Sequence, residues 1–142
     1  MNDDWSDDDD AREDGTVERE MYRGDTLTFL LQFVQPGTRA PQDMTGWFVQ
    51  FTAKRQYADQ DSQAVLVAKT TGSAPNVVTF PNGVTTGLAQ ISAAAGATVS
   101  LGDGVVRLVY DVQTIDPEGV VRTAERGRLK VLPDVTRAIV QG

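Results

Sequence analysis

Apolar and polar residues alternate with a period of two in several short segments of this chain, and this period limits the fold more than any other feature. Segments 26–34, 47–55 and 105–113 all alternate in this way, as expected for strands with one buried face. The apolar positions of the first segment are Leu27, Phe29, Leu31 and Phe33. No stretch of ten or more residues has a convincing helical period. We therefore expect an all-β protein, built as an antiparallel β-sandwich.

Turn residues divide the chain into these short segments. Segments 81–83 (PNG) and 116–119 (DPEG) predict turns, because Pro presets φ and Gly accepts a left-handed backbone. The expected strands are residues 26–34, 47–55, 64–70, 76–80, 87–93, 105–113 and 120–132. The alternation is expected to point five large side chains inward: Phe29, Trp47, Phe51, Leu108 and Tyr110. Residues 92–101 are the weak part of this assignment, since their alanines suit a single helical turn.

The first twenty residues carry almost all of the net charge. They hold ten acids and two arginines, which gives −8, whereas the whole chain is −7 and residues 21–142 are therefore +1. The run Asp7, Asp8, Asp9 and Asp10 repels itself and cannot bury enough apolar surface to offset the cost of ordering. We expect residues 1–20 to form a disordered or extended acidic arm and residues 21–142 to form the sandwich domain.

The missing residue types restrict the chemistry. The chain contains neither His nor Cys, which excludes the usual zinc sites and the Ser–His and Cys–His nucleophilic arrangements. Asp59 and Asp61 form a carboxylate pair in a polar loop, but any β-protein of this size has several acidic loops. We expect no enzyme activity, no catalytic residues, no cofactor and no defined metal site.

Two classes of partner are not expected. No apolar run approaches the ~18 residues of a membrane span, so we expect no membrane association. The nearly neutral body argues against nucleic-acid binding. Its one basic cluster is Arg126, Arg128 and Lys130, which alternation places on one strand face as a local stripe or a solvated edge.

Trp5 is the most suggestive residue of the arm. An indole among carboxylates gains little from water, and it suits an anchor that enters a partner's pocket while the acids steer toward a basic rim. The candidate partner-binding residues are Trp5, Asp7, Asp8, Asp9 and Asp10. The opposing interpretation is a harmless aromatic in a mobile arm. Arg23-Gly24-Asp25 spells an integrin-type tripeptide, but between two strands these are ordinary turn residues.

An ordered series of short motifs spans residues 22–137. It consists of Arg23-Gly24-Asp25-Thr26, Asp43-Met44-Thr45-Gly46-Trp47, Ala53-Lys54-Arg55, Gly87-Leu88-Ala89-Gln90-Ile91-Ser92, Thr98, Val109-Tyr110-Asp111-Val112-Gln113, Gly119, Thr123, Gly127 and Val135-Thr136-Arg137. In this order the motifs resemble small tailed-phage virion domains of the kind found at the N-terminus of upper baseplate proteins, and related stand-alone tail and virion proteins.

The resemblance implies an immunoglobulin-like β-sandwich that acts as a non-enzymatic structural component of a tailed-phage virion. Such a protein would be an adaptor or decoration of the baseplate, tail, neck or capsid surface. It would be present in multiple copies, contact other virion proteins and assemble in the host cytoplasm.

Two other functions fit the sequence. A free-standing β-sandwich module would recognise a carbohydrate or a host surface protein, although Tyr57 is the one aromatic residue near the predicted loops. An inhibitor would use the acidic arm to mimic nucleic acid, but ten acids form a patch too short to imitate a duplex well.

Overall fold

This computed structural model describes residues 17–94 and 104–133, and this part of the chain contains eight strands. The strands are β1 (Val17–Tyr22), β2 (Leu27–Gln32), β3 (Phe48–Lys54), β4 (Leu66–Lys69), β5 (Val77–Thr79), β6 (Leu88–Ala93), β7 (Val106–Ile115) and β8 (Val121–Leu132). Two short 3₁₀ turns, η2 (Asp61–Gln63) and η3 (Val84–Thr86), lie in the connections. The expected all-β class is confirmed.

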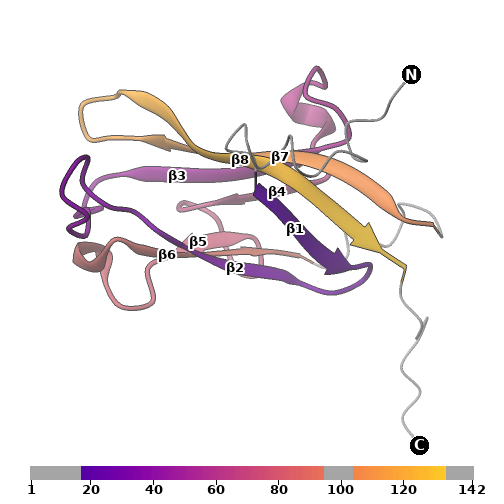
Figure 1. Ribbon diagram of the computed structural model, residues 1–142, viewed down its shortest axis with the longest axis horizontal. Coiled ribbons are helices and arrows are strands. Elements are labelled where there is room, and N and C mark those ends of the chain that lie inside the picture. The colour runs from indigo at the N-terminus through magenta and orange to yellow at the C-terminus, as the bar shows by residue number, and fades with distance from the viewer. Residues whose placement is uncertain (1–16, 95–103, 134–142) are drawn as a thin grey trace, which may run out of the picture.

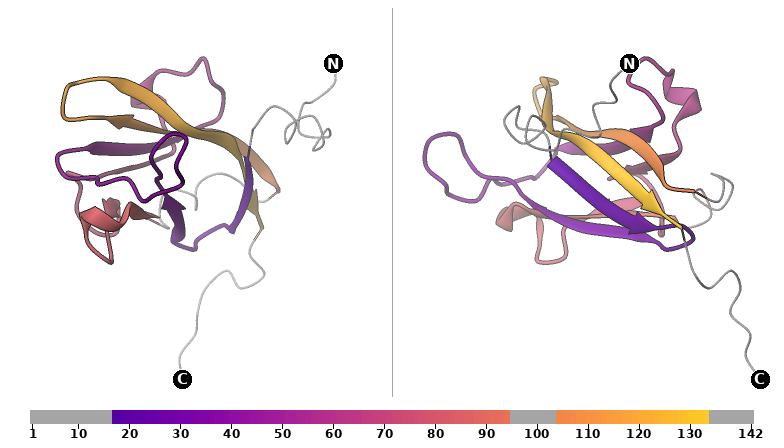
Figure 2. Two further views of the ribbon diagram at one scale, coloured as in Figure 1. Left: turned by 60° about the vertical axis from the view of Figure 1, so that its left-hand side comes forward. Right: turned by 45° about the vertical axis from the view of Figure 1, so that its right-hand side comes forward.

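The strands form one sheet in the order β1-β8-β7-β3-β4-β5-β6-β2. The sheet curls until its edge strands, β1 and β2, come together at the turn that joins them, which leaves a nearly closed barrel (Figure 1). Neighbouring strands are antiparallel except for β1 with β8 and β4 with β5. In two further views β8, β7 and β3 lie on one side of the core and β2, β5 and β6 on the other (Figure 2).

Three aromatic rings from different strands occupy the centre of the core. Phe51 of β3 lies 5.6 Å from Phe29 of β2 and 5.4 Å from Tyr110 of β7, measured between ring centroids. Leu108 is fully buried beside them, so four of the five side chains expected inside are buried. Since these rings come from both sides of the barrel, their contacts close the core across its width.

Trp47 departs from this expectation, because it is only partly buried. It precedes β3 and lines a hollow of about 390 Å³ at one end of the barrel, beside Phe33 and Pro36. The ion pair between Arg122 and Asp116, 3.5 Å apart, borders the same hollow. The period of two places Trp47 on the core side, but the core ends at Val49 and the indole lies at the rim.

The predicted strands agree with the observed ones to within a few residues. Two features differ from the prediction: one additional strand and one longer connection. The first is β1, whose residues are not among the expected strand ranges. Residues 17–20, expected in the acidic arm, pair with β8, and Lys130 lies 4.0 Å from Glu20. The second is the connection after β5, where η3 lengthens the hairpin predicted at residues 81–83. Residues 95–101 of the uncertain segment lie outside the described residues.

Candidate functional site

A polar cluster inside the barrel joins its two edges. Arg19 of β1 donates from Nε to the Tyr110 hydroxyl at 2.9 Å, and its Nη2 lies 3.0 Å from the Glu125 carboxylate. The Tyr110 hydroxyl donates to the same Glu125 carboxylate at 2.5 Å. The guanidinium carbon of Arg19 lies 3.9 Å from the centre of the Phe29 ring on β2. One cation therefore connects β1, β2, β7 and β8.

Two features of β8 make room for this cluster. Gly127 lies against the Tyr110 ring, and a Cβ at this position would come within 2.8 Å of ring carbons. A β-bulge lies just before Gly127 in β8, because Val112 pairs with Glu125 while Gln113 pairs with Thr123. The cluster is mostly enclosed and its groups satisfy one another, so it holds the barrel together rather than presenting groups to a ligand.

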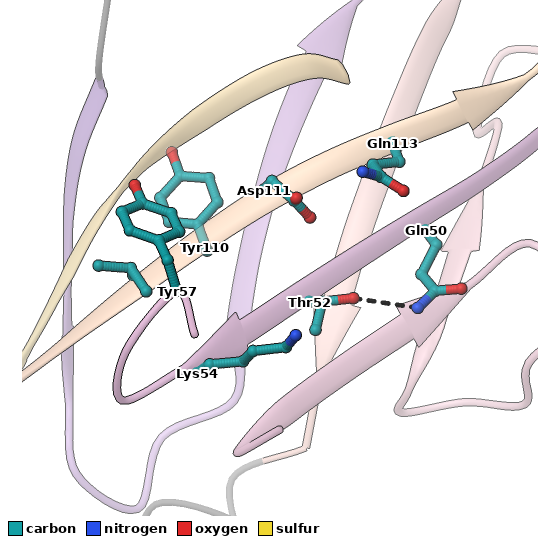
Figure 3. A pocket seen from close by; sticks show the side chains of 8 residues that line it. Gln50, Thr52, Lys54, Tyr57, Tyr110, Asp111 and Gln113 are labelled. Atoms are coloured by element: carbon teal, nitrogen blue, oxygen red, sulfur yellow. Dashed lines mark hydrogen bonds between the residues drawn. The ribbon is translucent and has the colours of Figure 1, made fainter. Parts of the chain in front are cut away.

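A second hollow, also open to solvent, lies on the outer face of β3 and β7 (Figure 3). Its volume is about 240 Å³. The strand register places Gln50 opposite Gln113 and Thr52 opposite Asp111, so their side chains meet across the two strands. Gln50 donates to the Thr52 hydroxyl at 3.0 Å. We call this hollow the β3–β7 groove; it is lined by Gln50, Thr52, Lys54, Tyr57, Val109, Tyr110, Asp111 and Gln113.

Tyr57 stands at one end of the β3–β7 groove on the loop that follows β3. The Lys54 ammonium donates to the Asp59 carbonyl at 2.9 Å, and the Gln56 amide donates to the Asp59 carboxylate at 3.2 Å, so both ends of this loop are fixed. The Arg126 guanidinium lies 4.9 Å from the centre of the Tyr57 ring. About half of Tyr57 (51%) remains exposed, so an aromatic surface is held beside polar side chains.

Charge divides the described strands into two groups. The strands β2, β5 and β6 contain no charged residue, whereas each of the other five contains at least one. The outer surface of β2 and β6 consists of Thr28, Leu30, Gln32, Leu88, Gln90 and Ser92, which are exposed or half-buried. Leu30 is 53% exposed. We call this surface the uncharged face.

The sequence-predicted site residues are mostly outside these features. Trp5, Asp7, Asp8, Asp9 and Asp10 lie outside the described residues. Arg126, Arg128 and Lys130 alternate with the buried side of β8, as predicted.

The remaining motifs have structural roles where they can be described. Arg23 of the Arg23-Gly24-Asp25 turn is only 7% exposed, which does not suit an integrin ligand. Asp59 caps its own loop, and the side chain of Asp61 lies outside the described residues.

Neither a metal site nor a membrane span is found among residues 17–94 and 104–133. No three carboxylates of that part gather as metal ligands. None of its helices has the length and apolar character needed to cross a bilayer. Comparison with known protein families and with characterised proteins finds no match for the chain.

The sequence held part of the signal for the β3–β7 groove. Alternation alone places Gln50, Thr52 and Lys54 on one face of their strand. It also places Asp111 and Gln113 together on one face of a second strand. What it lacks is the register between β3 and β7, which are separated by more than fifty residues. The position of Tyr57 over the strands depends on the loop hydrogen bonds, which no local pattern reveals.

Tyr110 generates a prediction about pH. Burial raises the pKa of its phenol, and the hydrogen bond to Glu125 raises the pKa further. The folded chain therefore keeps this proton more firmly than the unfolded chain, whose tyrosine titrates near pH ~10. The stabilisation that comes from this proton is present in full below pH ~10, and it is lost as the pH rises through the pKa of Tyr110 in the folded chain.

Tyr110→Phe should remove this dependence. In urea titrations, the free energy of unfolding of the wild type should exceed that of Tyr110→Phe by more at about pH 8 than at about pH 11. Tyr57→Phe, which changes an exposed phenol, is the matched control. Its free energy of unfolding should change with pH in the same way as that of the wild type. If the difference in free energy of unfolding between the wild type and Tyr110→Phe does not change with pH, the fold does not hold the phenol proton.

Proposed function

We propose that this chain is a non-enzymatic structural component of a tailed-phage virion, with an immunoglobulin-like sandwich as its body. The connectivity supports the sandwich, because β4 and β5 meet at a single residue pair, Lys69 with Val77. In the proposed sandwich this weak junction would be the boundary between a layer β1-β8-β7-β3-β4 and a layer β5-β6-β2, although all eight strands are joined in one sheet.

One of the motifs that resemble virion domains, Asp43-Met44-Thr45-Gly46-Trp47, has a framework role in this chain. Asp43 accepts hydrogen bonds from the Thr45 amide at 3.0 Å and the Thr45 hydroxyl at 2.6 Å. Met44 between them is buried. Gly46 has a positive φ of 79° and lies against Pro117, so a Cβ there would be strained. These residues build a scaffold, which suits an adaptor or decoration protein better than an enzyme.

The uncharged face is the observation that carries the proposal. Isolated soluble domains commonly cover a solvated strand face with charged side chains, which also keep an edge strand such as β2 from pairing with other chains. Here β2 lies at the edge of the sheet as described and contains neither charge nor proline. A face of this kind is suited to close packing against a neighbouring subunit in a multi-copy assembly.

The acidic arm supplies a second proposed contact. Trp5 would enter a pocket of a virion partner, while Asp7, Asp8, Asp9 and Asp10 would approach a basic rim. Val17 pairs with Gly127 at the start of β1, so the arm leaves the domain at a fixed point. The body would position this anchor in each copy.

Leu30→Lys tests the uncharged face. In particles assembled with this variant, quantitative mass spectrometry should find at least about tenfold fewer copies, because a buried unpaired charge opposes packing. Tyr22→Lys is the matched control, since Tyr22 is also 53% exposed but lies on β1. Normal copy numbers for Leu30→Lys, or absence of the wild-type chain from purified particles, would overturn the proposal.

Deleting residues 2–15 tests the arm. The deletion leaves β1 intact, so the melting temperature of the free protein should be nearly unchanged while incorporation into particles falls. Trp5→Ala should reproduce part of the loss at any salt concentration, because charge attraction is screened beyond ~8–10 Å and an aromatic contact is not. If the deletion variant assembles as well as the full chain, the arm contributes only solubility.

A further inference from the structure

We propose that the β3–β7 groove binds one unit of a neutral saccharide, with Tyr57 as its stacking surface. This site is separate from the uncharged face and from the acidic arm. It lies on the opposite layer of the barrel, so a subunit packed through β2 and β6 would leave it open to solvent.

The polar lining matches hydroxyl groups. A sugar hydroxyl both donates and accepts hydrogen bonds, and the amides of Gln50 and Gln113 do the same. Thr52 lies at the floor, 9% exposed, and its hydroxyl already accepts from Gln50, which fixes that amide in place. The register sets Gln113 directly across from Gln50, so two amides border one space.

The charges of the lining argue for a neutral ligand. Lys54 and Asp111 are the one cation and the one anion among the residues that line the groove, and they stand on neighbouring strands. An anionic ligand would meet Asp111, and a cationic one would meet Lys54. A polyhydroxyl ligand suits both groups, because a hydroxyl accepts from an ammonium and donates to a carboxylate even where each already has a partner within the fold.

The Tyr57 ring supplies the apolar surface. One side of a pyranose ring presents C–H groups, which pack on an aromatic face. The Lys54–Asp59 hydrogen bond and the nearby Arg126 guanidinium hold Tyr57 in place, so little ordering is required when a ligand binds. A hollow of about 240 Å³ is smaller than a typical drug site, and it suits one sugar ring rather than a long chain.

The same geometry indicates binding without cleavage. Glycoside hydrolysis ordinarily uses two carboxylates, about 5–10 Å apart, on either side of the bond. Asp111 is the single carboxylate among the residues that line the groove. The site can therefore hold a sugar but lacks the second group that would break the glycosidic bond.

Solution NMR of the full-length chain tests this proposal without particles, so its outcome is independent of the proposed virion role. Methyl glycosides of glucose, galactose, mannose and N-acetylglucosamine are titrated separately to tens of millimolar. At least one should shift the side-chain amide signals of Gln50 and Gln113 in a saturable manner. Mannitol, which has the hydroxyl groups but no ring, should shift them at least about tenfold less at equal concentration.

Variants assign the response to the groove. Tyr57→Ala and Asp111→Ala should each weaken the apparent affinity at least about fivefold, while Tyr22→Ala, a change at an equally exposed tyrosine, should leave the affinity unchanged. The amide spectrum of each variant reports whether it is folded. Absence of saturable shifts with all four glycosides, equal shifts with mannitol, or full binding by folded Tyr57→Ala would each overturn the proposal.

Discussion

The contacts of the Arg19 guanidinium close this barrel, because they link its first edge strand to the other side of the core. The two edge strands of the sheet, β1 and β2, are consecutive in the chain and do not pair with each other. Arg19 bridges them from inside, stacked on Phe29 of β2 and bonded to Tyr110 and Glu125. A carboxylate enclosed in this way needs its cation, because losing one partner leaves the other charge unpaired. The closure also fixes β1, and with it the point where the acidic arm joins the domain.

Closing the sheet gives the molecule two different outer surfaces. The layer that contains β3, β7 and β8 carries charged and polar side chains and forms the β3–β7 groove beside Tyr57. The layer of β2, β5 and β6 presents the uncharged face. We infer a division of roles, in which one layer packs against neighbouring subunits and the other contacts a saccharide.

Sequence alternation was sufficient for most of the fold but not for the candidate site. Seven strands and the capped turn after β7 follow from local patterns, because each strand has one buried face and Asp116 accepts from the Glu118 and Val120 amides. The strand β1 was missed since its inward Arg19 and acidic neighbours look like the solvated arm. Only the pairing with β8 shows that Arg19 has partners in the core. Trp47 was placed too deep, because alternation does not show where a core ends.

Native-state hydrogen exchange of Arg19→Met tests the central role of this arginine most directly. Methionine keeps an unbranched apolar side chain near Phe29 but leaves Glu125 without its cation. Lys130→Met is the control, because it removes the ion pair with Glu20 that also joins β1 and β8. An ion pair near the surface contributes little to stability. We expect amides of β1 to lose about ten- to a hundredfold protection in Arg19→Met, while those of β4 and β5 change less and the control resembles the wild type. Unchanged protection of β1, or an equal loss in every strand, would contradict the account.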